Sequence, residues 1–129
     1  KLMREARRVL RRGGLCVITT PNRLILSPGR DTPINPFHVR EYDLEEFRAF
    51  MEEFFPRVEV KGVFHAGRLR LHDLLVRRNF SQFCLNIPPL LQRLFYLPFF
   101  LPSLTTRCFR VSDRSLEEAL DFIGMGWKE

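Results

Sequence analysis

Apolar and polar positions along the chain repeat with two different periods, which separates expected helices from expected strands. Between residues 2 and 10 the apolar side chains recur at helical spacing and arginines fill the other positions, which predicts an amphipathic helix. The glycine pair Gly13-Gly14 is expected to end this helix, because glycine accepts the left-handed conformation that a helix terminus often needs. Residues 15–20 (LCVITT) then form a continuous apolar, β-rich run, typical of a strand buried on both faces of a parallel sheet.

The segment that follows, residues 21–40, carries the signals of a loop. Pro21 cannot donate to a sheet ladder and Asn22 favours turns, so the strand is expected to end near Thr20. Four prolines and Gly29 lie in the twenty residues, which predicts a long connection without a regular element. Long ordered loops are often functional, so this loop is a candidate for carrying chemistry.

A second helix and strand are expected after this loop. Asp43 with Glu46 three residues later has the spacing of a capping box. The helix carries an aromatic and aliphatic stripe, interpreted as core: Leu44, Phe47, Phe50, Met51 and Phe54. Pro56 is expected to close the helix, and residues 58–64 (VEVKGVF) alternate as a strand does.

Residues 67–110 are interpreted as a helical apolar insert within a single partial domain that spans residues 1–129. Its most apolar part, residues 83–104, is interrupted by four prolines and Arg93, so two short helices are expected and a bilayer-spanning helix is not. Three roles are compatible with these two short helices: a lid, a partner-binding face or a shallow membrane contact. Ser115 and Glu118 have capping-box spacing for a short helix, and residues 121–128 predict a closing strand.

The net charge of +6 is concentrated at the start of the chain, where six Lys and Arg residues among the first twelve are opposed by Glu5 alone. No nucleic-acid-binding motif accompanies them, so a solvated helix face is favoured and a nucleic-acid partner is not. The three cysteines Cys16, Cys84 and Cys108 are widely spaced without a C-x-x-C pair, which predicts no metal site and fits a reducing cytoplasm. A chain that opens at Lys1 within a charged amphipathic stretch is expected to be a piece of a longer protein.

Three segments together resemble class I S-adenosylmethionine-dependent methyltransferases. Residues 10–22 (LRRGGLCVITTPN) are similar to the stretch in which a helix ends at a glycine turn and enters the fifth strand, although Arg12 stands where proline is common. Residues 35–42 (NPFHVREY), followed by the Asp43 helix, resemble a bacterial subgroup of these enzymes. Residues 116–128 (LEEALDFIGMGWK) resemble the last helix and the antiparallel last strand of that subgroup.

The resemblance implies an α/β fold: the C-terminal part of a Rossmann-like sheet, comprising its fifth to seventh strands with the last one antiparallel, and a helical insert. It also implies S-adenosylmethionine as the cofactor of the complete enzyme. No G-x-G-x-G-like loop after a strand and no acidic residue ending a second strand occur in this sequence. These features cradle the cofactor in the family, so the pocket is expected to be incomplete and the chain inactive alone.

Methyl transfer requires alignment of a nucleophile with the sulfonium methyl and, for a hydroxyl acceptor, removal of a proton. The candidate general base is His38, because histidine titrates near neutral pH, and Glu41 is the candidate to orient it. Thr20, Pro21, Asn22 and Tyr42 are the candidate substrate-binding residues, since the fifth strand ends there. His65, His72 and Cys16 have no partner pattern and are given no role.

Each of these residues also has a plainer interpretation. His38 lies between Phe37 and Val39 and equally suits a turn or a packing position, Glu41 suits a surface ion pair or a partner for Arg40, and Tyr42 suits a packed aromatic.

Two functions are carried forward from the sequence. The first is an acceptor-side methyltransferase segment acting on a small-molecule or glycan-type acceptor. The second is a non-catalytic module that binds a protein or a membrane surface through the basic first helix or through residues 83–104.

Overall fold

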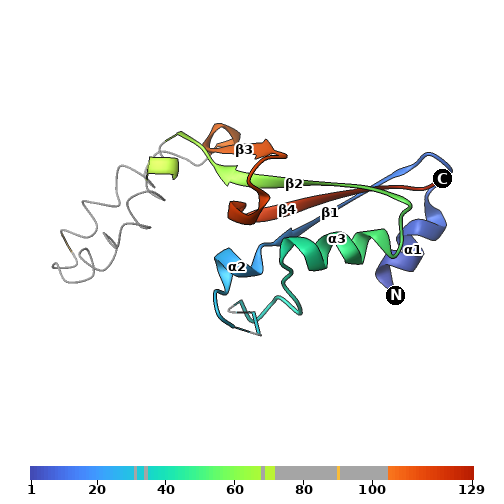
Figure 1. Cartoon of the computed structure of the whole chain (residues 1–129), viewed down its shortest axis with the longest axis horizontal. Coiled ribbons are helices and arrows are strands. Elements are labelled where there is room, and N and C mark those ends of the chain that lie inside the picture. Colours follow the sequence, from blue (N-terminus) through green and yellow to red (C-terminus); the bar gives the residue numbers. More distant parts are fainter. Residues whose placement is uncertain (31, 34, 68, 72–89, 91–104) are drawn as a thin grey trace. The chain divides into compact units, whose positions relative to one another are not determined.

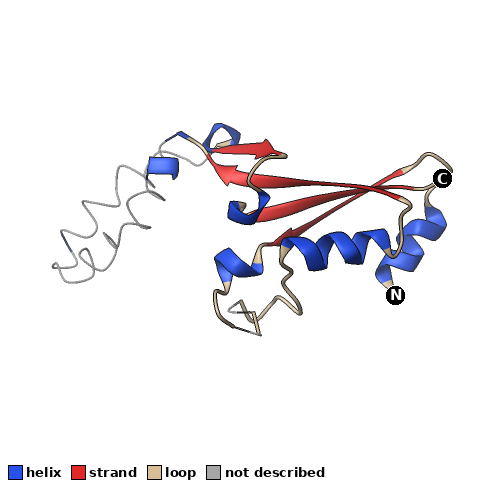
Figure 2. Ribbon diagram, viewed as in Figure 1, coloured by secondary structure: helices blue, strands red, loops and turns tan. Residues whose placement is uncertain are grey.

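The computed structural model describes residues 1–30, 32–33, 35–67, 69–71, 90 and 105–129 (Figure 1). Residues 1–63 and 111–129 form one compact unit, and residues 64–110 form a second. Helices, strands and loops are distinguished by colour in Figure 2. The elements are, in chain order, α1 (Leu2–Val9), β1 (Leu15–Pro21), α2 (Arg23–Leu26), α3 (Leu44–Glu52), β2 (Arg57–His65), the 3-10 turn η1 (Thr106–Cys108), β3 (Phe109–Ser112), the 3-10 turn η2 (Leu116–Glu118) and β4 (Asp121–Trp127).

The strands form one four-stranded sheet in the order β1-β4-β2-β3. The last strand, β4, pairs antiparallel with β1 on one side and with β2 on the other. β1 and β2 therefore run in the same direction, although they do not pair with each other. The chain is thus a mixed α/β structure, and the expected antiparallel last strand is confirmed.

Helix α3 packs against one face of this sheet through its aromatic side chains. Phe47 and Met51 of the expected stripe are buried, as is Phe55 just beyond the helix. The other three stripe residues are partly exposed, so the stripe is confirmed in part: Leu44, Phe50 and Phe54. Phe122, Gly124 and Gly126 of β4 point to the same face and are buried, whereas the residues between them are partly exposed. A Cβ at Gly124 would lie 2.8 Å from the Phe47 ring, so glycine there lets the helix approach the strand closely.

Within the described chain, β1 is not buried on both faces, and its one described neighbour, β4, is antiparallel to it. Leu15, Val17 and Thr19 are exposed, and the strand shows period-two alternation. The pairing of Cys16 with Gly126 and of Thr20 with Phe122 places the less exposed set on the face that α3 covers. A continuous apolar run therefore did not distinguish a doubly buried strand from one with a single covered face.

Two further expectations need correction. The predicted loop at residues 21–40 contains the one-turn helix α2, which Asn22 caps by accepting a hydrogen bond from the Leu24 backbone N–H at 3.0 Å. Ser115 does not cap a helix, because it adopts a left-handed conformation (φ 54°) and its side chain makes no capping hydrogen bond to the 3-10 turn η2. Strand β3 was not predicted. The two short helices expected within residues 83–104 lie outside the described residues, which include only Leu90 of this range.

The capping box of α3 is confirmed, since Glu46 N–H donates to Asp43 Oδ1 at 2.9 Å and Asp43 N–H donates to Glu46 Oε2 at 3.3 Å. The Glu46 backbone hydrogen bond lowers the pKa of Asp43, burial opposes this, and the Arg23 guanidinium at 2.7 Å lowers the pKa further. A carboxyl whose pKa is depressed by folding stabilises the fold above its unfolded pKa of about 3.9, and this contribution disappears as the pH falls through the lower folded pKa.

Replacing Asp43 with alanine is therefore expected to lower the free energy of unfolding by about 1 kcal/mol at pH 7. Asparagine at this position keeps the capping acceptor but not the charge, so Asp43→Asn should retain more stability and show a weaker loss between pH 5 and pH 3. Urea unfolding at both pH values measures this. An unchanged pH dependence in Asp43→Asn would contradict the assigned role of the carboxylate.

Among the described residues, no helix is long and apolar enough to cross a membrane.

Candidate functional site

A broad hollow of about 790 Å³ opens where β1 ends. Its lining comes from the last three residues of β1, from the segment that follows Pro36, and from the adjoining ends of β2 and β4. These residues are Thr19, Thr20, Pro21, Phe37, His38, Val39, Arg40, Tyr42, Val63, Asp121 and Ile123. Four of the six residues selected from the sequence, His38, Thr20, Pro21 and Tyr42, thus share one hollow.

The loop reaches this position because its end is attached to the end of β1. Asn22 and Tyr42 form a parallel β-bridge, and the Arg23 N–H donates to the Tyr42 carbonyl at 2.9 Å. The loop between Asn22 and Tyr42 therefore begins and ends at the same point, the end of β1. This closure puts His38 and Glu41, which lie just before Tyr42, beside the carboxyl end of the strand.

His38 and Glu41 form a hydrogen-bonded pair, with His38 Nδ1 2.7 Å from Glu41 Oε1. The Glu41 side chain is 1% exposed, whereas that of His38 is 29% exposed and faces the hollow. Glu41 is therefore a buried partner of His38, and its interpretation as a surface ion pair is wrong. No ion pair with Arg40 is formed by any carboxylate among the described residues.

Burial raises the pKa of Glu41, but the pKa is lowered overall, chiefly by the hydrogen bonds from His38 and from Ser27. Glu41 is then ionised at neutral pH and accepts hydrogen bonds without donating any. The proton between the two side chains accordingly belongs to His38 Nδ1.

The other ring nitrogen of His38 faces Asn35, whose Nδ2 lies 3.1 Å from Nε2. The amide orientation of Asn35 is set by its own loop, because Asn35 Oδ1 accepts from the Phe37 N–H at 3.0 Å. Nδ2 is therefore turned toward the ring and donates to Nε2, which must carry a lone pair. In this arrangement His38 carries its proton on Nδ1 and accepts a hydrogen bond at Nε2.

Asn22 is the one predicted substrate-binding residue that does not line the hollow. Its side chain is fully buried and donates to the carbonyls of Glu117 at 3.0 Å and Ala119 at 2.8 Å, while its Oδ1 caps α2. All three of these hydrogen bonds are internal to the protein, so the Asn22 amide has a structural role: it links the end of β1 to the turn before β4.

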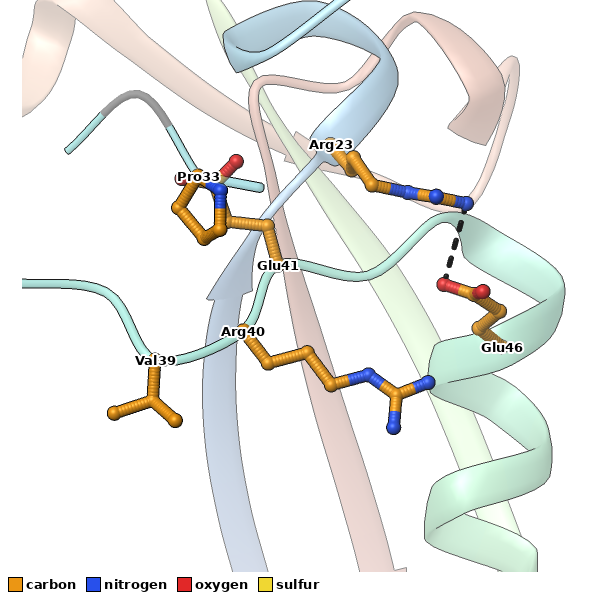
Figure 3. A pocket seen from close by; sticks show the side chains of 6 residues that line it. All are labelled: Arg23, Pro33, Val39, Arg40, Glu41 and Glu46. Carbon is orange, nitrogen blue, oxygen red and sulfur yellow. Dashed lines mark ion pairs between the residues drawn. The ribbon is translucent and has the colours of Figure 1, made fainter. Parts of the chain in front are cut away.

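Tyr42 both lines the hollow and packs against α3, with ring centroids 6.0 Å from Phe47 and 5.3 Å from Phe50. The Arg40 guanidinium lies 4.5 Å from the Tyr42 ring centroid, a cation-π distance. Arg40 and Val39 also line a smaller hollow of about 240 Å³, together with Arg23, Pro33, Glu41 and Glu46. Figure 3 shows Arg23 paired with Glu46 across this second hollow, at 3.4 Å.

Ser27 and Asn35 are the site residues that sequence reasoning missed. Asn35 lies in the NPFHVREY segment, so its place three residues before His38 was a usable signal; nothing local marks Ser27 as a partner of Glu41. Of the residues that were given no role, His65 packs against Phe109 with ring centroids 5.6 Å apart. Burial raises the pKa of the Cys16 thiol, which stays protonated at neutral pH.

The chain is similar to three curated bacterial proteins, each named a probable S-adenosylmethionine-dependent methyltransferase. It is 49% identical over 74 residues, 57% of this chain, to one from Mycobacterium tuberculosis strain CDC 1551 / Oshkosh and equally to one from strain H37Rv. It is 50% identical over 66 residues, 50% of this chain, to one from Mycolicibacterium smegmatis.

The aligned parts cover 27% of the Mycobacterium tuberculosis proteins and 26% of the Mycolicibacterium smegmatis protein, so the match spans about a quarter of the length of these relatives. No protein-family model and no solved structure matches the chain. About half of the chain is therefore a methyltransferase-like segment.

The described residues include three glycines with positive φ. The glycines with positive φ stand singly: Gly13 precedes β1, Gly29 follows α2 and Gly67 follows β2. A glycine-rich turn after a strand, which lets backbone approach a nucleotide-like ligand, is not assembled from them.

Proposed function

We propose that the chain is the acceptor-side, C-terminal segment of an S-adenosylmethionine-dependent methyltransferase that methylates a small-molecule or glycan-type acceptor and is inactive without the cofactor-binding part. The observation that carries this proposal is the His38–Glu41 pair, held 2.7 Å apart, in which buried Glu41 supports a His38 ring that lines the hollow at the carboxyl end of β1. The similarity to methyltransferases over half of the chain supports the reaction class.

In this proposal β1, β2 and β4 are the fifth, sixth and seventh strands of a Rossmann-like sheet. Their arrangement supports this assignment, since β1 and β2 run in the same direction and β4 lies between them antiparallel to both. Open α/β sheets bind ligands outside the carboxyl ends of their parallel strands, which is where the hollow lies.

His38 acts in the proposal as the general base that takes the proton of an acceptor hydroxyl. Nε2 receives this proton while Nδ1–H continues to donate to Glu41, whose negative charge stabilises the imidazolium that forms. The exposed side chains of Phe37 and Val39 offer apolar contact area for the acceptor, and Thr20 lines the hollow beside them. The volume of the hollow is in the range of small-molecule sites.

A non-catalytic interaction module is the second candidate. The side chains of Leu15 and Val17 are 44% and 55% exposed on the sheet face opposite α3, which provides apolar area for a binding partner. Residues 83–104, proposed for contact with a membrane surface, lie outside the described residues.

Calorimetric titration with S-adenosylmethionine distinguishes the two candidates. It is to be run on this chain and on a form extended upstream through a glycine-rich loop. We expect binding by the extended form and none by this chain. Binding by neither form would contradict the methyltransferase proposal and favour the interaction module.

A further inference from the structure

The carboxylate of Glu41 is held at both of its oxygens. Oε1 accepts from His38 Nδ1–H at 2.7 Å, and Oε2 accepts from the Ser27 hydroxyl at 2.6 Å. Ser27 is 1% exposed and Glu41 is 3% exposed, so water does not replace either contact readily. With both oxygens bound, the plane of the carboxylate is fixed, and with it the direction in which Oε1 meets the imidazole.

Ser27 takes this position because of the one-turn helix α2. It is the C-terminal cap residue of α2, and its N–H donates to the Arg23 carbonyl at 2.9 Å. Asn22 begins the same turn directly at the end of β1. The backbone therefore carries the Ser27 hydroxyl from the end of the strand to the buried side of Glu41.

Asn35 bounds His38 from the opposite side. Asn35 is fixed in the turn of residues 35–38 by two hydrogen bonds. The His38 N–H donates to the Asn35 carbonyl at 3.0 Å, and the Phe37 N–H donates to Asn35 Oδ1 at 3.0 Å. These bonds leave Nδ2 directed at Nε2, 3.1 Å away. An amide donor thus occupies the position from which an acceptor hydroxyl would donate its proton.

We infer that Ser27 and Asn35 are positioning residues for His38: Ser27 acts through Glu41 to keep the proton on Nδ1, and Asn35 holds Nε2 as the acceptor until the methyl acceptor's hydroxyl takes its place. The second half of this inference rests on the proposed function. The first half concerns the ring alone and holds whether or not the chain belongs to an enzyme.

Nitrogen NMR of the chain labelled at histidine with ¹⁵N tests the inference at neutral pH. The wild-type His38 should give one protonated-type signal, from Nδ1, and one unprotonated-type signal, from Nε2. Ser27→Ala should move the two signals toward each other, because a carboxylate held at one oxygen no longer fixes a single tautomer. Ser27→Thr keeps a hydroxyl and should restore the wild-type pattern.

Asn35→Asp gives the sharper result. A carboxylate in place of the amide requires a proton on Nε2, so both His38 nitrogens should become protonated-type, with Glu41 on one side and the new carboxylate on the other. The charged groups that share the hollow with His38 are Arg40 and Asp121, and both are unchanged in every variant.

Ser112→Ala is the matched control, because the Ser112 hydroxyl accepts a local hydrogen bond from the Arg114 N–H at 3.1 Å outside the hollow. Its His38 signals should match the wild type. Amide spectra of α3 verify that each variant is folded. Wild-type signals in both folded Ser27→Ala and Asn35→Asp would overturn the inference.

Methylation by the upstream-extended form separates this inference from the proposed function. Altered His38 signals together with a reduced rate support both. Altered signals with an unreduced rate support the positioning of His38 and contradict its role as the base.

Discussion

Replacing Gly126 with alanine is expected to lower the free energy of unfolding by about 1–3 kcal/mol, the usual cost of overpacking a core. The added Cβ would lie 2.4 Å from Phe55 Cδ2, 2.5 Å from Cγ and 2.9 Å from Cβ. Non-bonded carbon atoms do not approach each other this closely in folded proteins. Because Phe55 is 1% exposed, its ring has little room to turn away from the added methyl group. Either β4 or the segment just after α3, which carries Phe55, must therefore shift. This shift disturbs the packing of the helix against the sheet.

Urea unfolding of a double-mutant cycle measures this effect. Phe55→Leu removes the ring that the new methyl group meets, so Gly126→Ala should cost less in its presence than in the wild type. Phe54→Leu is the matched control, since Phe54 adjoins Phe55 but faces a different hollow, near Arg4 and Arg7 of α1. Additive losses in the Phe55 cycle would contradict the close packing described for Gly126.

Replacing His38 with alanine in the upstream-extended protein is expected to lower kcat for methyl transfer to a hydroxyl acceptor by about 10²–10⁴-fold, the usual contribution of a general base. The physical reason is that Nε2 is the basic atom of the site: Glu41 keeps the proton on Nδ1 at 2.7 Å and the ring faces the hollow. The release of S-adenosylhomocysteine with a panel of sugar and phenol acceptors measures the rate. S-Adenosylmethionine binding should be unchanged.

Imidazole added to His38→Ala distinguishes a base from a packing residue, because a diffusible base restores proton removal but not packing. We expect partial recovery of the rate. His65→Ala is the control, since His65 packs against Phe109 away from the hollow, and it should leave kcat near the wild-type value. A wild-type rate in folded His38→Ala would remove His38 from the reaction.

The sequence predicted most of the local structure because local structure has local causes. The helical spacing of residues 2–10 and the Asp43–Glu46 capping box each lie within a single helix, and the structure confirms both. Of the stripe predicted for α3, Phe47 and Met51 are buried. Ser115 shows the limit of such signals, because its spacing to Glu118 fits a capping box but its left-handed backbone does not. A side-chain pattern does not fix the backbone angles that a cap requires.

The candidate site was predicted in part for a similar reason. His38 and Glu41 are three residues apart, and a turn brings such neighbours together whatever the rest of the chain does. Asn22 was assigned to substrate because it follows the strand, but its amide is satisfied by carbonyls 95 and 97 residues away along the chain. The end of a strand in the sequence does not tell which polar side chains face outward.

By itself, then, the sequence determined the longer elements α1, β1, α3, β2 and β4, the most buried positions of α3 and the identity of the histidine-carboxylate pair, since each depends on residues a few positions apart. The tertiary structure decided that β4 pairs with both β1 and β2, that Gly126 receives the Phe55 ring, and that Ser27 holds the buried oxygen of Glu41. These contacts join segments separated by long stretches of chain. The periodicity of apolar residues in the sequence predicts which side chains are buried. Which residues pack against them depends on the tertiary arrangement of the elements, because the core must pack without voids.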